Sequence, residues 1–320
     1  MKTQGQKKKK LTFSTLLKIL KNTIKGFSDD NVPRLSASLA YATLFSIIPF
    51  LSLLITIGTF FHADLTNQLY IQLQPIIGID SVEQLKGLIQ SAQETDSSMF
   101  ATILSLGISI FGATAIFAEM QDSLNTIWGI KAVPKKSWLK YIKTRLLSFS
   151  LILVFAFILL ITFSITNVIE NLSSRFMSSY PDTAESLVRV IGTIINIGVT
   201  VFIFTLILKM LPDAKIKSKD VVVGASVTTL LFLIGQWAIS LYIGIADIGS
   251  IYGAAAFMAI FVTWIYYSAI IIYIGAEFTE SWANEMGSKI FPDEFAVTTQ
   301  IIEIHDNKPL QSINKKEIKK

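Results

Sequence analysis

Six long stretches of the chain contain no charged residue and alternate with polar segments. They cover 38–61, 101–117, 147–167, 190–208, 221–245 and 252–276, and each is 17 to 25 residues long. A helix that crosses the hydrocarbon core of a bilayer needs about 20 apolar residues, with roughly 17–25 tolerated. Because backbone groups in lipid must satisfy their own hydrogen bonds, stretches of this kind are expected to be helical. The pattern predicts an all-α integral membrane bundle of six transmembrane helices.

Lysine and arginine residues concentrate in alternate connecting segments. Their numbers are 9 in 1–37, 1 in 62–100, 6 in 118–146, 2 in 168–189, 4 in 209–220, none in 246–251 and 6 in 277–320. Loops rich in these residues stay on the cytoplasmic side of a membrane. We therefore expect both termini to be cytoplasmic. The chain then divides into an N-terminal segment (1–37), a transmembrane domain (38–276) and a cytoplasmic C-terminal tail (277–320).

The composition is also that of a membrane protein. Hydrophobic residues make up 52% of the chain and charged residues 16%, with a mean hydropathy of +0.55, whereas soluble domains carry about 25% charged residues. The absence of cysteine excludes disulfides and thiol chemistry. The two histidines, His62 and His305, are predicted on opposite sides of the membrane. The net charge of +5 follows from the cytoplasmic bias of lysine and arginine, so we expect no nucleic-acid partner.

The N-terminal segment predicts an amphipathic helix at the membrane surface. Lys18, Lys21 and Lys25 lie off an apolar stripe, and a run of four consecutive lysines, 7–10, precedes it. A helix of this kind lies in the headgroup region and attracts anionic lipid headgroups, by about 1 kcal/mol per lysine. The alternative is a plain orientation signal. The stripe consists of residues at helical spacing, namely Phe13, Leu16, Leu17, Leu20, Ile24 and Phe27.

The long outer loop, 62–100, contains a second amphipathic pattern. Val82, Leu85, Leu88 and Ile89 recur at helical spacing, and acidic residues in the loop outnumber its single lysine. The pattern predicts a short helix. It would either cap the mouth of a cavity or belong to a solvated acidic loop.

Polar residues in and beside the apolar stretches are the candidates for lining or gating a transport path, because a polar side chain in hydrocarbon prefers a bundle interior or a wet cavity. Glu277, at the inner end of the last stretch, is the nearest ionisable residue, with Arg145 or Lys209 as a candidate partner. The alternatives are interhelical hydrogen bonds and, for the proline, a packing kink. The candidates are Pro49, Asn196, Gln236, Tyr252, Thr263 and Glu277.

Little in the sequence indicates catalysis. The motifs of nucleotide-binding loops, serine hydrolases and zinc proteases are absent. Glu277 and Glu280 stand three residues apart and could share a cation, although a helix end wetted by the cytoplasm explains them more simply. We expect a protein that is not an enzyme and that needs no cofactor or metal.

Three segments together resemble the YihY/BrkB family of membrane proteins. They are DNVPRLSASLAYATLFSIIP (30–49), MQDSLNTIWG (120–129) and the region 211–283, which contains LPDAKIKSKDVVVGA and IYGAAAFMAIFVTWIYYSAIIIYIGAEF. The segments occur in the family's order and at plausible spacing. Thr43, Phe45 and the Phe-Thr-Glu after Glu277 depart from the family's commoner choices.

The resemblance implies a six-helix protein of the bacterial cytoplasmic (inner) membrane with both termini inside. Some members carry virulence-factor or historical ribonuclease names. The function that we expect is export or translocation of a small solute or a lipid-like molecule. The alternatives are a scaffold or assembly factor for envelope machinery and, least favoured, a ribonuclease. An oligomer is compatible with the sequence.

Overall fold

The computed structural model describes residues 12–60, 70–71, 74, 79–93, 99–133, 146, 150–154, 157–158, 181–245, 256–287 and 289–299. Most of these residues are helical. The helices are α1 (Phe13–Asp29), α2 (Val32–Phe60), α4 (Ile79–Gln93), α5 (Met99–Ile127), α7 (Pro181–Met210), α8 (Ser218–Ile245) and α10 (Ala256–Glu285). Short strands are β1 (Ile130–Ala132), β2 (Ala214–Lys215), β3 (Phe291–Pro292) and β4 (Ala296–Thr298).

Four segments in the described part of the chain are long and apolar enough to cross a membrane: Val32–Leu51, Val190–Met210, Ser218–Ile239 and Met258–Glu285. They correspond to the first, fourth, fifth and sixth predicted spans. Helix α5 covers the second predicted span, and most of the third, 147–167, lies outside the described residues. The structure is thus a helical membrane fold, and the number of six spans stays a prediction.

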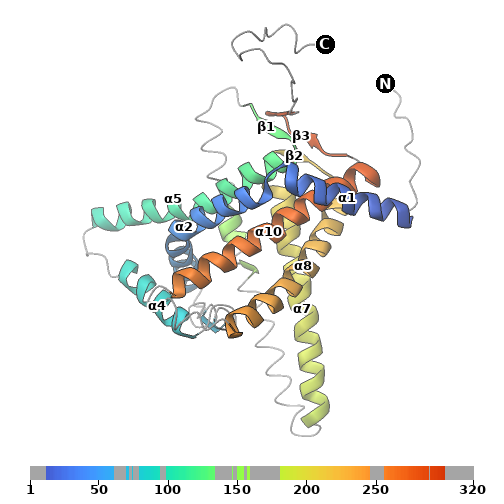
Figure 1. Ribbon diagram of the computed structural model, residues 1–320. Helices are drawn as coiled ribbons and strands as arrows, with labels where there is room; N and C mark the ends of the chain where they lie inside the picture. The colour runs from blue at the N-terminus through green and yellow to red at the C-terminus, as the bar shows by residue number, and fades with distance from the viewer. Residues whose placement is uncertain are drawn as a thin grey trace.

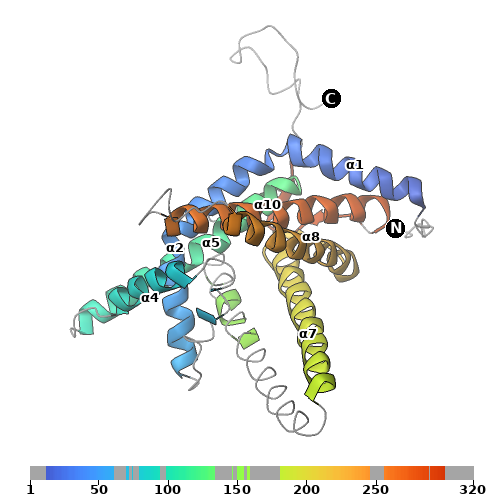
Figure 2. The ribbon, with the colours of Figure 1, turned by 60° about the horizontal axis from the view of Figure 1, so that its bottom comes forward.

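Helix α10 lies at the centre of the bundle. It contacts α2, α8 and α1, while α2 also packs against α5, and α8 against α7. Figure 1 shows α1 running across α10 near the strands, and in Figure 2 α7 points away from both. Buried apolar side chains such as Leu39, Leu124 and Leu208 form a continuous core. This packing fixes the C-terminal half of α10 against its neighbours.

Helices α8 and α10 approach closely through matched glycine and threonine residues. The Thr279 side chain occupies the position that a Cβ on Gly224 would take, and Thr228 does the same at Gly275. Small residues of this kind let helix backbones come together in membranes. Both threonine hydroxyls donate to carbonyls one turn earlier in their own helices, so the contact leaves them satisfied.

The strands form two small antiparallel sheets that the all-α prediction misses. Strand β1 pairs with β4, with Ile130 opposite Thr298, and β2 pairs with β3, with Ala214 opposite Pro292. Each strand has only two or three residues and pairs with a segment far away in the sequence. The described part of the predicted cytoplasmic C-terminal tail, 277–320, therefore contains the end of α10 and two strands. We call this end of the molecule, where the strands meet α1, α5 and α10, the strand end.

Helix α1 confirms the predicted N-terminal helix and presents two different apolar faces. Ile19 and Thr23 are buried, and α1 packs on α10. Most of the predicted stripe points elsewhere and is exposed: Phe13 (74%), Leu17 (52%), Leu20 (44%) and Ile24 (70%). At about 100° per residue, this exposed face lies roughly a quarter turn or more from the buried one. These four residues of the stripe are thus free of the helical bundle, whereas Phe27 packs against the core.

Candidate functional site

An acidic cavity of about 660 Å³ lies at the strand end, between α1, the end of α5, β1 and α10. Its walls carry amide and hydroxyl side chains, including Asn22, Asn284, Ser281 and Thr126. Four carboxyl groups and two lysines also line it, which makes the cavity acidic. The charged lining residues are Lys25, Asp29, Asp30, Lys131, Glu277 and Glu280.

Glu277 is the most deeply buried charged residue of this cavity. Only 2% of its surface is exposed, and its Oε1 atom has no hydrogen-bond partner in the described part of the chain. Gly26 of α1 lies so close that any side chain there would collide with the carboxyl group. A buried acceptor without a partner costs roughly 1–3 kcal/mol, and more when charged. The fold therefore keeps an unfavourable group at the cavity.

The other carboxyl oxygen of Glu277 has a partner in Asp30. The two side chains hydrogen-bond, and because a carboxylate can only accept, such a bond requires one proton between them. Burial raises the pKa of Asp30 above its ordinary value of 3.8, and the nearby charge of Asp29 raises it further, while the bond to Glu277 lowers it. The pair thus holds a proton where α1 meets α10.

Local chain geometry explains how Asp30 reaches this position. Asp30 and Asn31 form the turn between α1 and α2, and Asn31 adopts a φ of 53°, a left-handed conformation that asparagine tolerates well. Pro33 follows in the first turn of α2, where its missing N–H is not needed. The sequence therefore stops α1 directly beside the buried part of α10.

Trp128 and Gly129 join the end of α5 to α10. The buried indole Nε1 of Trp128 donates to the carbonyl of Ala276 at 3.1 Å, one residue before Glu277. Gly129 has a φ of 59°, which favours glycine. Its carbonyl accepts from the backbone N–H of Thr299 at 2.7 Å. These bonds close the strand-end side of the cavity.

The three sequence segments that resemble one family meet at the strand end. Asn125 Nδ2 donates to Asp213 Oδ2 at 3.0 Å, and the backbone N–H of Asp213 donates to Asn125 Oδ1 at 2.8 Å. Asp30 in turn reaches Glu277. Segments that are far apart in the sequence are thus joined around one cavity.

Of the six predicted path residues, the structure places Glu277 in the cavity. Asn196 and Thr263 are exposed on α7 and α10, and Gln236 is half-buried on α8. Pro49 lies inside α2 and packs close to Gly112 of α5, which agrees with a packing kink. Tyr252 lies outside the described residues. A path-lining role for these five residues stays a prediction.

The partner of Glu277 differs from the expectation. Lys209 donates its ammonium group to the carbonyl of Ile216, whereas Glu277 faces Asp30 and Gly26 on α1; Arg145 lies outside the described residues. Sequence reasoning missed Asp30 because it precedes the first apolar stretch by eight residues and belongs to no charge pattern. The sequence did contain a signal for the α10 wall of the cavity. Glu280 and Asn284 follow Glu277 by about one and two helical turns, so the three side chains share one face of the helix.

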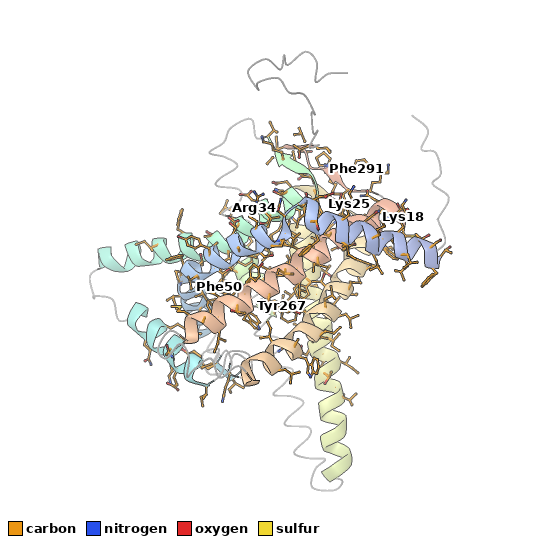
Figure 3. The ribbon with its side chains drawn as sticks, viewed as in Figure 1. Lys18, Lys25, Arg34, Phe50, Tyr267 and Phe291 are labelled. Atoms are coloured by element: carbon orange, nitrogen blue, oxygen red, sulfur yellow. The ribbon has the colours of Figure 1, made fainter. Side chains whose placement is uncertain are left out.

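The ion pairs that join described residues of the helices near this cavity involve neither Asp30 nor Glu277. Lys18 pairs with Glu285 at 2.5 Å and joins α1 to the end of α10, and Lys25 lies 3.9 Å from Asp29. Figure 3 shows Lys18 and Lys25 spaced along α1. Within the described ranges, no group of three or more histidine, cysteine or carboxylate side chains is arranged to hold a metal ion.

The mostly helical fold, with four helices long and apolar enough to cross a membrane among the described residues, indicates an integral membrane protein. A family model described as "Virulence factor BrkB" matches residues 23–294, and the chain belongs to this family. It is similar to the "UPF0761 membrane protein" of Cronobacter sakazakii, at 24% identity over 78% of this chain and 83% of that protein. The relative of the same name from Psychromonas ingrahamii is 26% identical over 85% and 88%. No solved structure matches.

Proposed function

We propose that this chain is a non-enzymatic protein of the bacterial cytoplasmic membrane that exports or translocates a small solute or a lipid-like molecule. One observation carries the proposal: the buried, partly unpartnered carboxyl group of Glu277 opens onto a cavity of about 660 Å³. Ionisable side chains within membrane bundles are costly and mark substrate or ion pathways. Cavities of roughly 300–1,000 Å³ accept small-molecule ligands.

The proposed orientation places the strand end and both termini in the cytoplasm. Two connecting segments rich in lysine and arginine, 118–146 and 209–220, contribute β1 and β2 to this end, as the positive-inside rule requires. In this orientation the acidic cavity is the cytoplasmic entrance of the path, where a molecule leaving the cell would first bind.

We further propose that α1 lies in the cytoplasmic headgroup region and contacts anionic lipids. Its exposed apolar residues, Phe13, Leu17 and Ile24 among them, belong to the face that the bundle leaves free, while its lysines supply positive charge next to that face. A helix with these two features binds at an anionic membrane surface. This contact would hold Asp30, at the end of α1, at a fixed depth.

A leaflet-protection assay tests the proposed function. Purified protein is placed in liposomes with a fluorescent lipid, and a membrane-impermeant quencher is added. In protein-free liposomes about half of the fluorescence, from the inner leaflet, is protected. We expect quenching well beyond the outer-leaflet half when the protein moves lipid. Protection that stays at half excludes passive lipid movement, and a flux assay with entrapped solutes then decides between solute export and the alternative, an envelope scaffold.

A further inference from the structure

Among the described residues that line the acidic cavity, carboxyl groups outnumber lysines. Four carboxyl groups and two lysines line it. Even with one proton between Asp30 and Glu277, the charge of these described lining residues stays on the negative side. Removing such a charge from water is unfavourable without a positive partner. The cavity is therefore suited to a cationic ligand.

A second observation points to where the cation binds. Oε1 of Glu277 is buried and accepts no hydrogen bond from any described residue, although the side chain belongs to the cavity wall. Its other oxygen is engaged by Asp30. A planar guanidinium group prefers both oxygens of one carboxylate, whereas a compact ammonium group needs only one. The single open oxygen thus favours an ammonium group.

The rest of the lining decides between kinds of ammonium group. No aromatic residue is among the described residues that line the cavity, and quaternary ammonium groups are recognised by aromatic cages. Asn22, Asn284 and Ser281 instead offer oxygen atoms to N–H donors. The described residues also form no carboxylate group suited to a metal ion. A ligand with several N–H donors on one cationic nitrogen fits these walls.

We propose that the acidic cavity binds a primary ammonium group, with Glu277 Oε1 as its buried acceptor. This proposal deepens the proposed function, on which it rests, by naming the chemical group that the site takes from its substrate. The group has two sources, a free organic amine or the headgroup of an aminophospholipid. At about 660 Å³ the cavity has room for more than the ammonium group itself.

Ligand-dependent unfolding of the full-length protein tests the binding, because a ligand that binds the folded state raises the unfolding midpoint. The protein is placed in phosphatidylcholine nanodiscs and titrated with ethylammonium or, at equal concentration, tetramethylammonium. We expect ethylammonium to raise the midpoint and tetramethylammonium to leave it unchanged. Glu277→Gln replaces the carboxyl oxygen by a weaker, neutral amide acceptor and should weaken ethylammonium binding about tenfold.

Two further variants make the outcome decisive. Glu280→Gln removes a second lining carboxyl and should also weaken binding, which keeps the test valid if Glu277→Gln does not fold. Glu294→Gln, a carboxyl outside the cavity lining, should bind as the wild type does. Equal responses to the two cations, or an ethylammonium response that survives in both cavity variants, would overturn the proposal.

A lipid exchange separates the two sources of the ammonium group. Part of the phosphatidylcholine is replaced by phosphatidylethanolamine with the same acyl chains, without added amine. If phosphatidylethanolamine raises the unfolding midpoint and the effect depends on Glu277 or Glu280, the source is the lipid headgroup. If only ethylammonium raises the midpoint, the source is a free amine. Selective binding without translocation would remove only the proposed function. Translocation without ammonium selectivity would remove only this inference.

Discussion

Gly26 is the residue that allows the Glu277 carboxyl group to remain buried beside α1. A side chain at this position would occupy the space of the carboxyl group, so the glycine sets the distance between α1 and α10. Neither residue could be matched from the sequence, because about 250 positions separate them and neither belongs to a shared motif. Sequence analysis selected Glu277 as the nearest ionisable residue to the spans, and the structure places it in the cavity wall. It could not find Asp30, whose position depends on the turn at Asn31.

Stability should depend on pH through Asp30. Because burial raises the pKa of Asp30 above 3.8, the folded protein holds this proton more tightly than the unfolded chain does. The contribution to stability is fully present below about pH 4 and falls as the pH rises above it. We expect the unfolding midpoint of the wild type to fall as the pH rises, and that of Asp30→Asn to fall less. Midpoints measured in nanodiscs from about pH 4 to about pH 8 give both slopes.

Glu294→Gln, outside the cavity lining, is the matched control for this measurement. The account would be contradicted by an Asp30→Asn variant whose midpoint changes with pH as steeply as that of the wild type.

At the scale of elements, helices were predictable and strands were not. The helical spacing in 13–27 and 82–89 predicted α1 and α4, and Val82, Leu85 and Ile89 are indeed buried. The strands are too short to show a period of two, and their pairing depends on contacts between distant segments. The face of α1 that meets α10 was also missed, because Ile19, Thr23 and Gly26 are less apolar as a set than the exposed stripe.

The proposed surface position of α1 predicts that its apolar face lies closer to the lipid than its polar face does. Because the chain has no cysteine, a single fluorescent label can be attached at Leu17→Cys or, as a control, at Ser14→Cys. Both residues are exposed, but only Leu17 belongs to the apolar stripe. We expect nitroxide lipids labelled near the headgroup to quench the Leu17 label more strongly. Equal quenching at the two positions would mean that the stripe does not enter the membrane.

At the scale of the whole molecule, the proposed orientation predicts which residues can be reached from each side of the membrane. Lys25, Lys131 and Lys215, from three lysine-rich segments, lie at the strand end, and α4 belongs to the segment with a single lysine, 62–100. We expect Gln90→Cys on α4 to react with an impermeant maleimide from outside the cytoplasmic membrane, and Glu294→Cys to react only after permeabilisation. Both parent residues are exposed. Labelling of the two in the opposite order would reverse the orientation and place the cavity outside.

The most direct test of the central claim compares translocation by three proteins in the same liposomes: wild type, Glu277→Gln and Glu294→Gln. If the acidic cavity is the entrance of the path, Glu277→Gln should slow lipid or solute movement roughly tenfold, because a neutral amide is a weaker acceptor than the carboxyl group. Glu294→Gln, a carboxyl outside the cavity lining, should move cargo at the wild-type rate. Equal rates for all three folded proteins would contradict the account.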